Sequence, residues 1–290
     1  MNELKKSKMR YIVVLVLGFA FLSSCKNEIP KEWVYQKTIK LDGVNPIGLA
    51  YKGDELWLSD GDHNRLVHLG VDGEIIKTID SLERPMHIDA NDKYLFVAEY
   101  GNDRVSNLYE DINYKSGFKQ TPFWIGVKDS LDAPASVFFY NAELAIADFY
   151  NNRILFDDGV DWISFGKEGK KQGEFYYPTD VQITDSLIWV ADAYNNRIQV
   201  FDKKGNFVKM MGQRQKMNAA TGLFVSKTEV FITDFENKRV LVFDHEGLLK
   251  QELKEGIAKA TDLLIKNDIL HIINYRTGEL VLYDLQDKKT

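Results

Sequence analysis

The chain contains very little cysteine, histidine or proline. Of its 290 residues, one is cysteine, five are histidine and six are proline. A single thiol cannot form an intramolecular disulfide, so the folded domain must be stabilised by its core. Five histidines argue against a zinc site built from three of them. The sequence also has no Gly-x-Ser-x-Gly elbow, phosphate-binding glycine loop or Cys-x-x-Cys pair. Nucleophilic, nucleotide and thiol redox chemistry therefore have no support.

The apolar run near the N-terminus is too short to span a bilayer. It covers residues 11–22, follows four basic residues, and leads into the only cysteine, Cys25. About twenty apolar residues are needed to cross a membrane, so this run indicates a processing signal. Leu22-Ser23-Ser24-Cys25 resembles a bacterial lipobox. We expect a lipoprotein signal peptide at residues 1–24, then the lipidated Cys25 and a tether at 25–31. The resemblance implies an outer-membrane lipoprotein of the cell envelope, on either side of that membrane.

The charge balance is acidic. The whole chain has a net charge of −6, and removal of residues 1–24 takes away four basic side chains and one acid, which changes it to −9. Such a chain repels a polyphosphate, so nucleic acid is not expected as a partner. We expect the membrane to be contacted through the lipid anchor, with a protein, peptide or glycan as the ligand.

One short pattern occurs six times. Each copy is an apolar run, a polar turn rich in Asp, Asn and Gly, and a second apolar run, which is typical of a β-hairpin. The copies begin at Leu56 (LWLSDGDHNRLVHL), Leu95 (LFVAEYGNDRVSNL), Leu144 (LAIADFYNNRILF), Ile188 (IWVADAYNNRIQVF), Val230 (VFITDFENKRVLVF) and Leu270 (LHIINYRTGELVLY). Successive turns are 39, 49, 44, 42 and 40 residues apart. A period near forty with about four strands per unit predicts an all-β protein, a six-bladed β-propeller.

The last repeat lacks a fourth strand, because the chain stops soon after residue 285. The segment 33–41 near the N-terminus alternates apolar and polar residues and resembles the outer segment of the fifth repeat. We therefore expect this segment to complete the sixth blade and close the ring, which removes open sheet edges. The propeller is expected to cover residues 32–290 as one domain.

The fourth repeat shows a resemblance to a known family. It reads GEFYYPTDV from Gly173 and VADAYNNRIQVF from Val190, and this resembles an NHL repeat. The resemblance is strong in the third to fifth repeats and weak in the sixth, where Asn274 and Glu279 replace the usual Asp and Arg. It implies a six-bladed propeller. NHL-type and related propellers include protein-binding and RNA-binding modules, lactonase-like enzymes and amidating lyases, so the resemblance indicates the fold more than the function.

Residues that recur in every blade are expected to serve the fold, as with the Asp, Asn and Arg of each turn. Residues that differ between blades are better candidates for function. At the start of the inner strands the sequence places His87, Asp180 and Asp262, which should meet in the central channel. Such a set suits zinc or another divalent metal. The alternative is that the two aspartates cap loop amides and the histidine fills space.

Aromatic side chains follow the turn acids in most repeats. They are Tyr100, Phe149, Tyr150, Tyr194, Phe235 and Tyr275. Their turns should share one face of the ring, where aromatic side chains either bind a ligand or pack between blades. We therefore expect a lipid-anchored binding or scaffolding module that uses this face. The alternative is a channel-centred, metal-dependent enzyme of the lyase or lactonase class that uses His87, Asp180 and Asp262.

Overall fold

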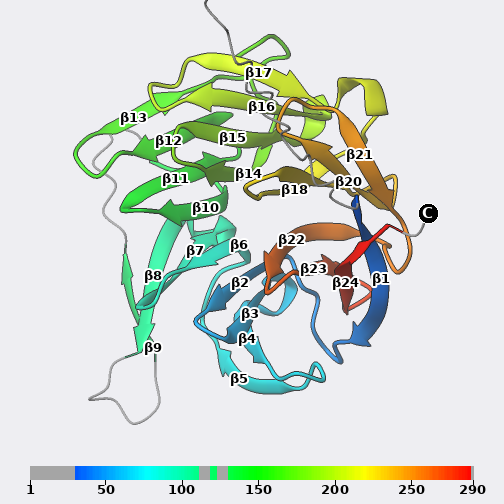
Figure 1. Ribbon diagram of the computed structural model, residues 1–290. Coiled ribbons are helices and arrows are strands. Elements are labelled where there is room, and N and C mark those ends of the chain that lie inside the picture. Colours follow the sequence, from blue (N-terminus) through cyan, green and yellow to red (C-terminus); the bar gives the residue numbers. More distant parts are fainter. Residues whose placement is uncertain (1–29, 111–117, 123–129, 289–290) are drawn as a thin grey trace, which may run out of the picture.

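The computed structural model describes residues 30–110, 118–122 and 130–288. In these residues six four-stranded antiparallel sheets surround a central axis, which confirms the predicted six-bladed β-propeller (Figure 1). The predicted signal peptide and Cys25 lie outside the described residues, as does much of the long connection between the second and third repeats. No helix of the described part is long and apolar enough to cross a membrane.

In blades 1 to 5 the strands follow one another in the chain from the axis outward, whereas blade 6 takes its outermost strand from residues 31–40. Blades 1 and 2 contain β2 (Gly48–Lys52), β3 (Glu55–Asp60), β4 (Arg65–Leu69), β5 (Ile75–Ile79), β6 (Pro85–Ala90), β7 (Tyr94–Glu99), β8 (Arg104–Glu110) and β9 (Phe118–Pro122). Blades 3 and 4 contain β10 (Pro134–Tyr140), β11 (Glu143–Asp148), β12 (Arg153–Asp157), β13 (Trp162–Phe165), β14 (Pro178–Ile183), β15 (Leu187–Asp192), β16 (Arg197–Asp202) and β17 (Phe207–Met211). Blades 5 and 6 contain β18 (Ala220–Val225), β19 (Glu229–Asp234), β20 (Arg239–Asp244), β21 (Leu249–Leu253), β22 (Ala260–Lys266), β23 (Ile269–Asn274), β24 (Glu279–Asp287) and β1 (Lys31–Lys40).

The ring is closed by β1, as the sequence predicted. β1 pairs antiparallel with β24 along nearly its whole length, and the sheet order is β1-β24-β23-β22. In Figure 1 the blue N-terminal strand lies beside the red C-terminal one. Trp33 of β1 is buried and contacts Phe231 of blade 5 edge to face, with ring centroids 5.5 Å apart. The first and last segments of the propeller are therefore joined in one blade.

The core lies between blades. The buried apolar residues of the described part form six clusters, and each joins two adjacent blades. For example, Val181 and Ile183 of β14 pack with Ala145 and Phe156 of blade 3. Because strand residues alternate in direction, the residues between these apolar ones face the central axis. The inner strands therefore present a second set of side chains, at alternate positions, to the channel.

The turns between the second and third strands all lie at one end of the ring, which we call the hairpin face. Three of these turns are short 3-10 segments: η1 (Gly61–His63), η2 (Tyr100–Asn102) and η3 (Ala193–Asn195). Another 3-10 segment, η4 (Gln213–Gln215), lies in the loop that leads from β17 into β18. The lead-in loops share this face, because Tyr194 N donates to Tyr176 O at 3.2 Å and Tyr275 N donates to Lys259 O at 2.8 Å. The turns at the other ends of the strands form the far face.

Candidate functional site

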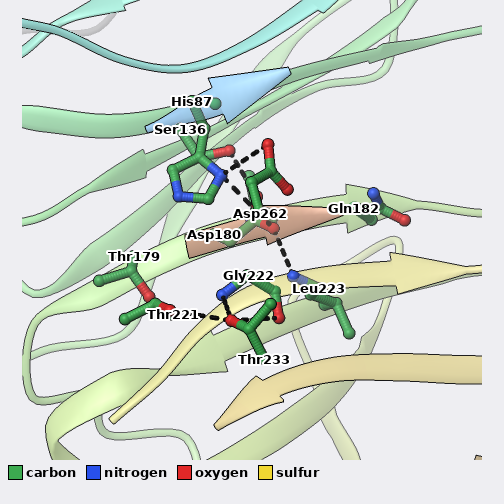
Figure 2. A network of polar contacts seen from close by, with 12 residues as sticks. His87, Ser136, Thr179, Asp180, Gln182, Thr221, Gly222, Leu223, Thr233 and Asp262 are labelled. Atoms are coloured by element: carbon green, nitrogen blue, oxygen red, sulfur yellow. Dashed lines mark hydrogen bonds and ion pairs between the residues drawn. The ribbon is translucent and has the colours of Figure 1, made fainter. Parts of the chain in front are cut away.

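The predicted channel residues do meet. His87, Asp180 and Asp262 occupy equivalent positions on β6, β14 and β22, and each is at most 6% exposed. Figure 2 shows them pointing toward one another. At the same level two blades carry glycine, because the backbones approach too closely for a side chain. A Cβ on Gly48 would lie 2.6 Å from His87 Cα, and one on Gly222 would lie 2.3 Å from a backbone oxygen of blade 6. The three side chains are therefore enclosed, and do not lie at an open mouth.

Asp180 is held by donors from several blades. Its Oδ1 accepts hydrogen bonds from Ser136 Oγ at 2.7 Å and from its neighbour Val181 N at 2.8 Å. Its Oδ2 accepts one from Leu223 N in blade 5 at 2.7 Å and lies 3.8 Å from His87 Nδ1. The carboxylate thus links blades 2, 3 and 5 to blade 4.

Asp262 plays the same part on the other side of the ring. Its Oδ2 accepts a hydrogen bond from Leu49 N in blade 1 at 3.0 Å and lies 3.3 Å from His87 Nδ1. Its Oδ1 accepts one from Leu263 N at 2.8 Å. With the contacts of Asp180, one polar network touches all six blades. A buried network whose members are all paired makes the arrangement of the blades specific.

The pKa values of His87 and Asp180 depend on their burial and on the charges beside them. Burial alone would lower the pKa of His87, but Asp262 and Asp180 outweigh it and raise that pKa to about 9. Burial raises the pKa of Asp180 to about 6, although the His87 charge opposes this. The two aspartates thus favour the protonated form of His87, and the His87 charge favours the ionised form of Asp180.

The three side chains could serve as the donor set of a metal site. The His87 nitrogen and the two carboxylate oxygens lie within 4.8 Å of one another, which is close enough to share one cation. However, both Oδ2 atoms already accept a backbone N–H, and the histidine carries a proton at neutral pH. A metal ligand must be the neutral imidazole. The residues therefore fit a charged hydrogen-bond network better than a divalent metal site.

A small cavity of about 80 Å³ lies in the channel next to this network. Asp89 and Gln182, two residues further along β6 and β14, line it together with Phe138 and Phe224. Burial raises the pKa of Asp89 to about 7, although two backbone N–H groups oppose this. The sequence analysis missed Asp89 and Gln182; the alternation of the inner strands, extended by one more step from His87 and Asp180, would have found them.

The repeated Asp, Asn and Arg residues are structural, as expected. In blade 4, Asp192 accepts hydrogen bonds from Tyr176 N at 2.8 Å and from Arg197 Nε at 2.8 Å. Asn196, at φ 56°, accepts one from Ala219 N in blade 5 at 2.8 Å. Equivalent bonds occur in other blades. In blade 3, for example, Asn152 Oδ1 accepts a hydrogen bond from Tyr177 N of blade 4 at 2.8 Å. The repeat therefore holds each lead-in loop and connects it to the blade before.

Four of the predicted aromatic residues form a continuous cluster on the hairpin face. Tyr100 donates a hydrogen bond to Tyr150 through their hydroxyls at 2.7 Å, and its ring also contacts Phe149 at 5.8 Å. Phe149 stacks on Tyr177 with centroids 4.7 Å apart, and Tyr177 contacts Tyr194 edge to face at 5.1 Å. Together with Tyr176, which contacts Tyr177 and Tyr194, these residues span blades 2 to 4, and we call them the aromatic platform. Tyr150 is 48% exposed and Tyr194 59% exposed, so part of the platform faces solvent.

The other two predicted aromatics do not belong to the platform. Among the described residues, Phe235 and Tyr275 have no ring contact with it. Lys259 Nζ lies 4.5 Å from the centroid of Phe235, and the Tyr275 hydroxyl donates to Asp62 at 3.0 Å. The platform is therefore confined to blades 2 to 4, whereas Phe235 lies beside a cation and Tyr275 beside an acid.

Tyr176 and Tyr177 are platform residues that the sequence analysis did not select. They precede Pro178 in the lead-in loop of blade 4, and Tyr177 has φ 56°. The equivalent residues Arg84, Ala133 and Ala219 also have positive φ, so this backbone belongs to the repeat. The sequence signal at Tyr177 is its side-chain type, because the equivalent residue is arginine in blade 2 and alanine in blades 3 and 5.

Comparisons with known proteins agree with this geometry. The family model of the NHL repeat matches residues 175–201. RING finger protein nhl-1 of Caenorhabditis elegans is 35% identical over 75 residues, which are 24% of this chain and 8% of that protein. Protein brain tumor of Drosophila melanogaster is 26% identical over 110 residues, 36% of this chain and 11% of that protein. The chain therefore spans about a tenth of the length of these curated relatives.

The fold is shared with several solved structures. A streptogramin B lyase has a TM-score of 0.61 at 13% identity, covering 89% of this chain and 98% of that one. A gluconolactonase from Xanthomonas campestris has a TM-score of 0.64 at 12% identity, covering 89% of this chain and all of that one. At such identities the likeness concerns the fold alone. The protein is a six-bladed β-propeller, and its fourth blade matches the NHL repeat.

Proposed function

We propose that this propeller is a protein-binding module whose contact surface is the aromatic platform of blades 2 to 4. The observation that carries the proposal is the continuity of this cluster together with the exposure of Tyr150 and Tyr194. Tyrosine is enriched at binding interfaces because it buries a large rigid area and keeps a polar hydroxyl. The channel residues, in contrast, already satisfy one another and the backbone, which supports a structural part for them.

A photo-crosslinking amino acid at position 194 tests this proposal. We expect a covalent adduct with one partner protein in cells, because Tyr194 lies at the exposed edge of the platform. The matched control carries the same crosslinker at Asp54, whose side chain is fully exposed and lies on the far face. With the captured partner in hand, Tyr150→Ala should weaken binding by about 2 kcal/mol, as for an interface hot spot, at an unchanged melting temperature. Equal capture at both positions, or none at 194, would rule out this surface.

The second candidate is a metal-dependent enzyme of lyase or lactonase class centred on the channel. The convergence of His87, Asp180 and Asp262 is the one observation in its favour. Metal analysis of the purified protein separates the two candidates. We expect less than about a tenth of an equivalent of zinc, manganese or calcium, because a metal would have to displace the proton that the two carboxylates favour on His87. A stoichiometric metal that is lost, together with an activity, in Asp180→Ala would establish the enzyme instead.

We also propose that the propeller is tethered to the envelope through a lipid on Cys25. The lipobox-like sequence before this residue supports the proposal, and β1 begins only six residues after it. Cys25→Ser should abolish incorporation of labelled fatty acid and move the protein out of the membrane fraction. Labelled, membrane-bound Cys25→Ser protein would contradict the lipid anchor, without affecting the proposed binding surface.

A further inference from the structure

A second feature of the hairpin face lies directly beside the platform. A groove of about 380 Å³ runs between the η3 turn of blade 4 and the η4 segment that leads into blade 5. Asn195, next to Tyr194 in the chain, forms part of its wall, together with Lys170, Gln213 and Lys216. The groove therefore lies next to the exposed edge of the platform in the η3 turn.

The two lysines are presented by fixed backbone. Arg197 donates to Lys170 O at 2.9 Å, and Asn195 donates to Gly169 O at 2.8 Å. On the other wall Asn237 donates to Lys216 O at 3.0 Å, and the backbone of Lys216 has φ 51°. The repeat residues of blades 4 and 5 thus hold both loops, and this pre-organises the walls of the groove.

The charges of the two lysines have no acidic partner among the described residues. Both side chains are exposed, and in the part of the chain that the structure describes neither forms an ion pair. The guanidinium of Arg197, at the base of the groove, is occupied by Asp192 and backbone carbonyls. Glu174, an acid of the same loop, pairs with Lys167 at 3.5 Å, and the described residues that line the groove include no acid. In a protein with a net charge of −6, this is a local positive site.

We infer that the partner of the proposed binding module presents an extended acidic segment, which lies in this groove and continues onto the aromatic platform. The inference rests on the proposed function and names the chemistry of its partner. Carboxylates of the segment meet Lys170 and Lys216, and its proline or aromatic side chains contact Tyr194 and Tyr176. Opposite charges across an interface steer association and fix the register of the bound segment. Two lysines match the few carboxylates of a peptide better than a polyphosphate, which proteins commonly bind through about 6–10 phosphate contacts.

The test uses fluorescent eight-residue peptides with Glu at alternate positions and Pro or Tyr between them. The control peptide has Gln in place of each Glu, so that shape is kept and charge is removed. We expect the Glu peptide to bind at least about tenfold more tightly than the Gln peptide, with an affinity that falls as salt increases. Lys170→Glu with Lys216→Glu should weaken its binding at least about tenfold.

The matched protein control is Lys204→Glu with Lys227→Glu. These exposed lysines lie in turns of the same two blades but on the far face, as the strand registers show. We expect this variant to bind the Glu peptide like the wild type. Equal affinity for the two peptides, an equal loss in both double variants, or no binding up to about 1 mM peptide would overturn the inference. Tighter, lysine-dependent binding of single-stranded oligouridylate or of polygalacturonate would overturn it as well.

The crosslinker at position 194 separates this inference from the proposed function. If the Lys170→Glu, Lys216→Glu protein loses the partner that the otherwise unchanged protein captures, both stand. If it captures the partner equally well, the acidic segment is wrong and the platform remains the binding surface. If position 194 captures nothing in either protein, the proposed function itself is wrong.

Discussion

Deletion of residues 32–41 should lower the free energy of unfolding by several kcal/mol and cause aggregation. The deletion removes β1, so β24 becomes the exposed edge of blade 6. It also removes Trp33, whose indole packs on Phe231 and donates to Glu229 at 3.1 Å. Burial of each large apolar side chain contributes about 1.5–3 kcal/mol, and an unpaired edge strand is a template for association.

Single substitutions in the same strand divide this effect into its parts. Trp33→Ala should cost about 3–5 kcal/mol, because it leaves a cavity between blades 5 and 6. Gln36 is the matched control, since it lies at the irregularity in the β1 ladder and is exposed. Gln36→Ala should change the free energy of unfolding by only about 0.5 kcal/mol. The measurement is urea unfolding followed by circular dichroism; an unchanged midpoint for the deletion would show that the strand is only a tether.

Asp180→Ala should cost about 3–5 kcal/mol, because it breaks a buried charge network. The substitution leaves Leu223 N and Ser136 Oγ without their acceptor, and His87 keeps only one of its two carboxylates. Removal of one partner from a buried ion pair has this magnitude. Asp185→Ala is the control: its carboxylate accepts a hydrogen bond from the exposed Tyr140 hydroxyl at 2.6 Å, and its loss should cost about 0.5 kcal/mol. Equal costs for the two variants would show that the channel network contributes little.

The same network should make stability depend on pH. The native pKa of His87, about 9, lies above its ordinary value of 6.5, so the folded state holds the proton more tightly than the unfolded state. Its contribution is complete below pH 6.5 and is lost as the pH rises through 9. The free energy of unfolding should therefore fall with increasing pH across this window, by at most about 1.4 kcal/mol per pH unit. His87→Leu should remove this slope; a slope that persists would assign the dependence to other groups.

Much of the fold was predicted from the sequence because the propeller repeats itself. Six copies of one hairpin pattern gave the number of blades, and the alternating segment at residues 33–41 gave the closing strand, since β1 pairs with β24 as expected. Local patterns suffice for blades 1 to 5 because each is a sheet of consecutive strands, and only the closing strand of blade 6 comes from the other end of the propeller. The residues that recur, such as Asp192 and Arg197, were also interpreted correctly as structural, since their bonds serve every lead-in loop alike.

The hydrogen-bond pairing in the channel and the ring contacts of the platform, in contrast, depend on distances between blades. Alignment of the repeats could place His87, Asp180 and Asp262 at one level of the channel, but it could not show that Leu49 N and Leu223 N already occupy the carboxylates. Nor could it show that Tyr176 and Tyr177 join the aromatic side chains into one platform while Phe235 pairs with Lys259. The sequence determined the blades and the level of each side chain, because strand alternation and the repeat are local properties. Only the tertiary structure decided which side chains are satisfied and which face solvent, because that depends on how closely neighbouring blades approach.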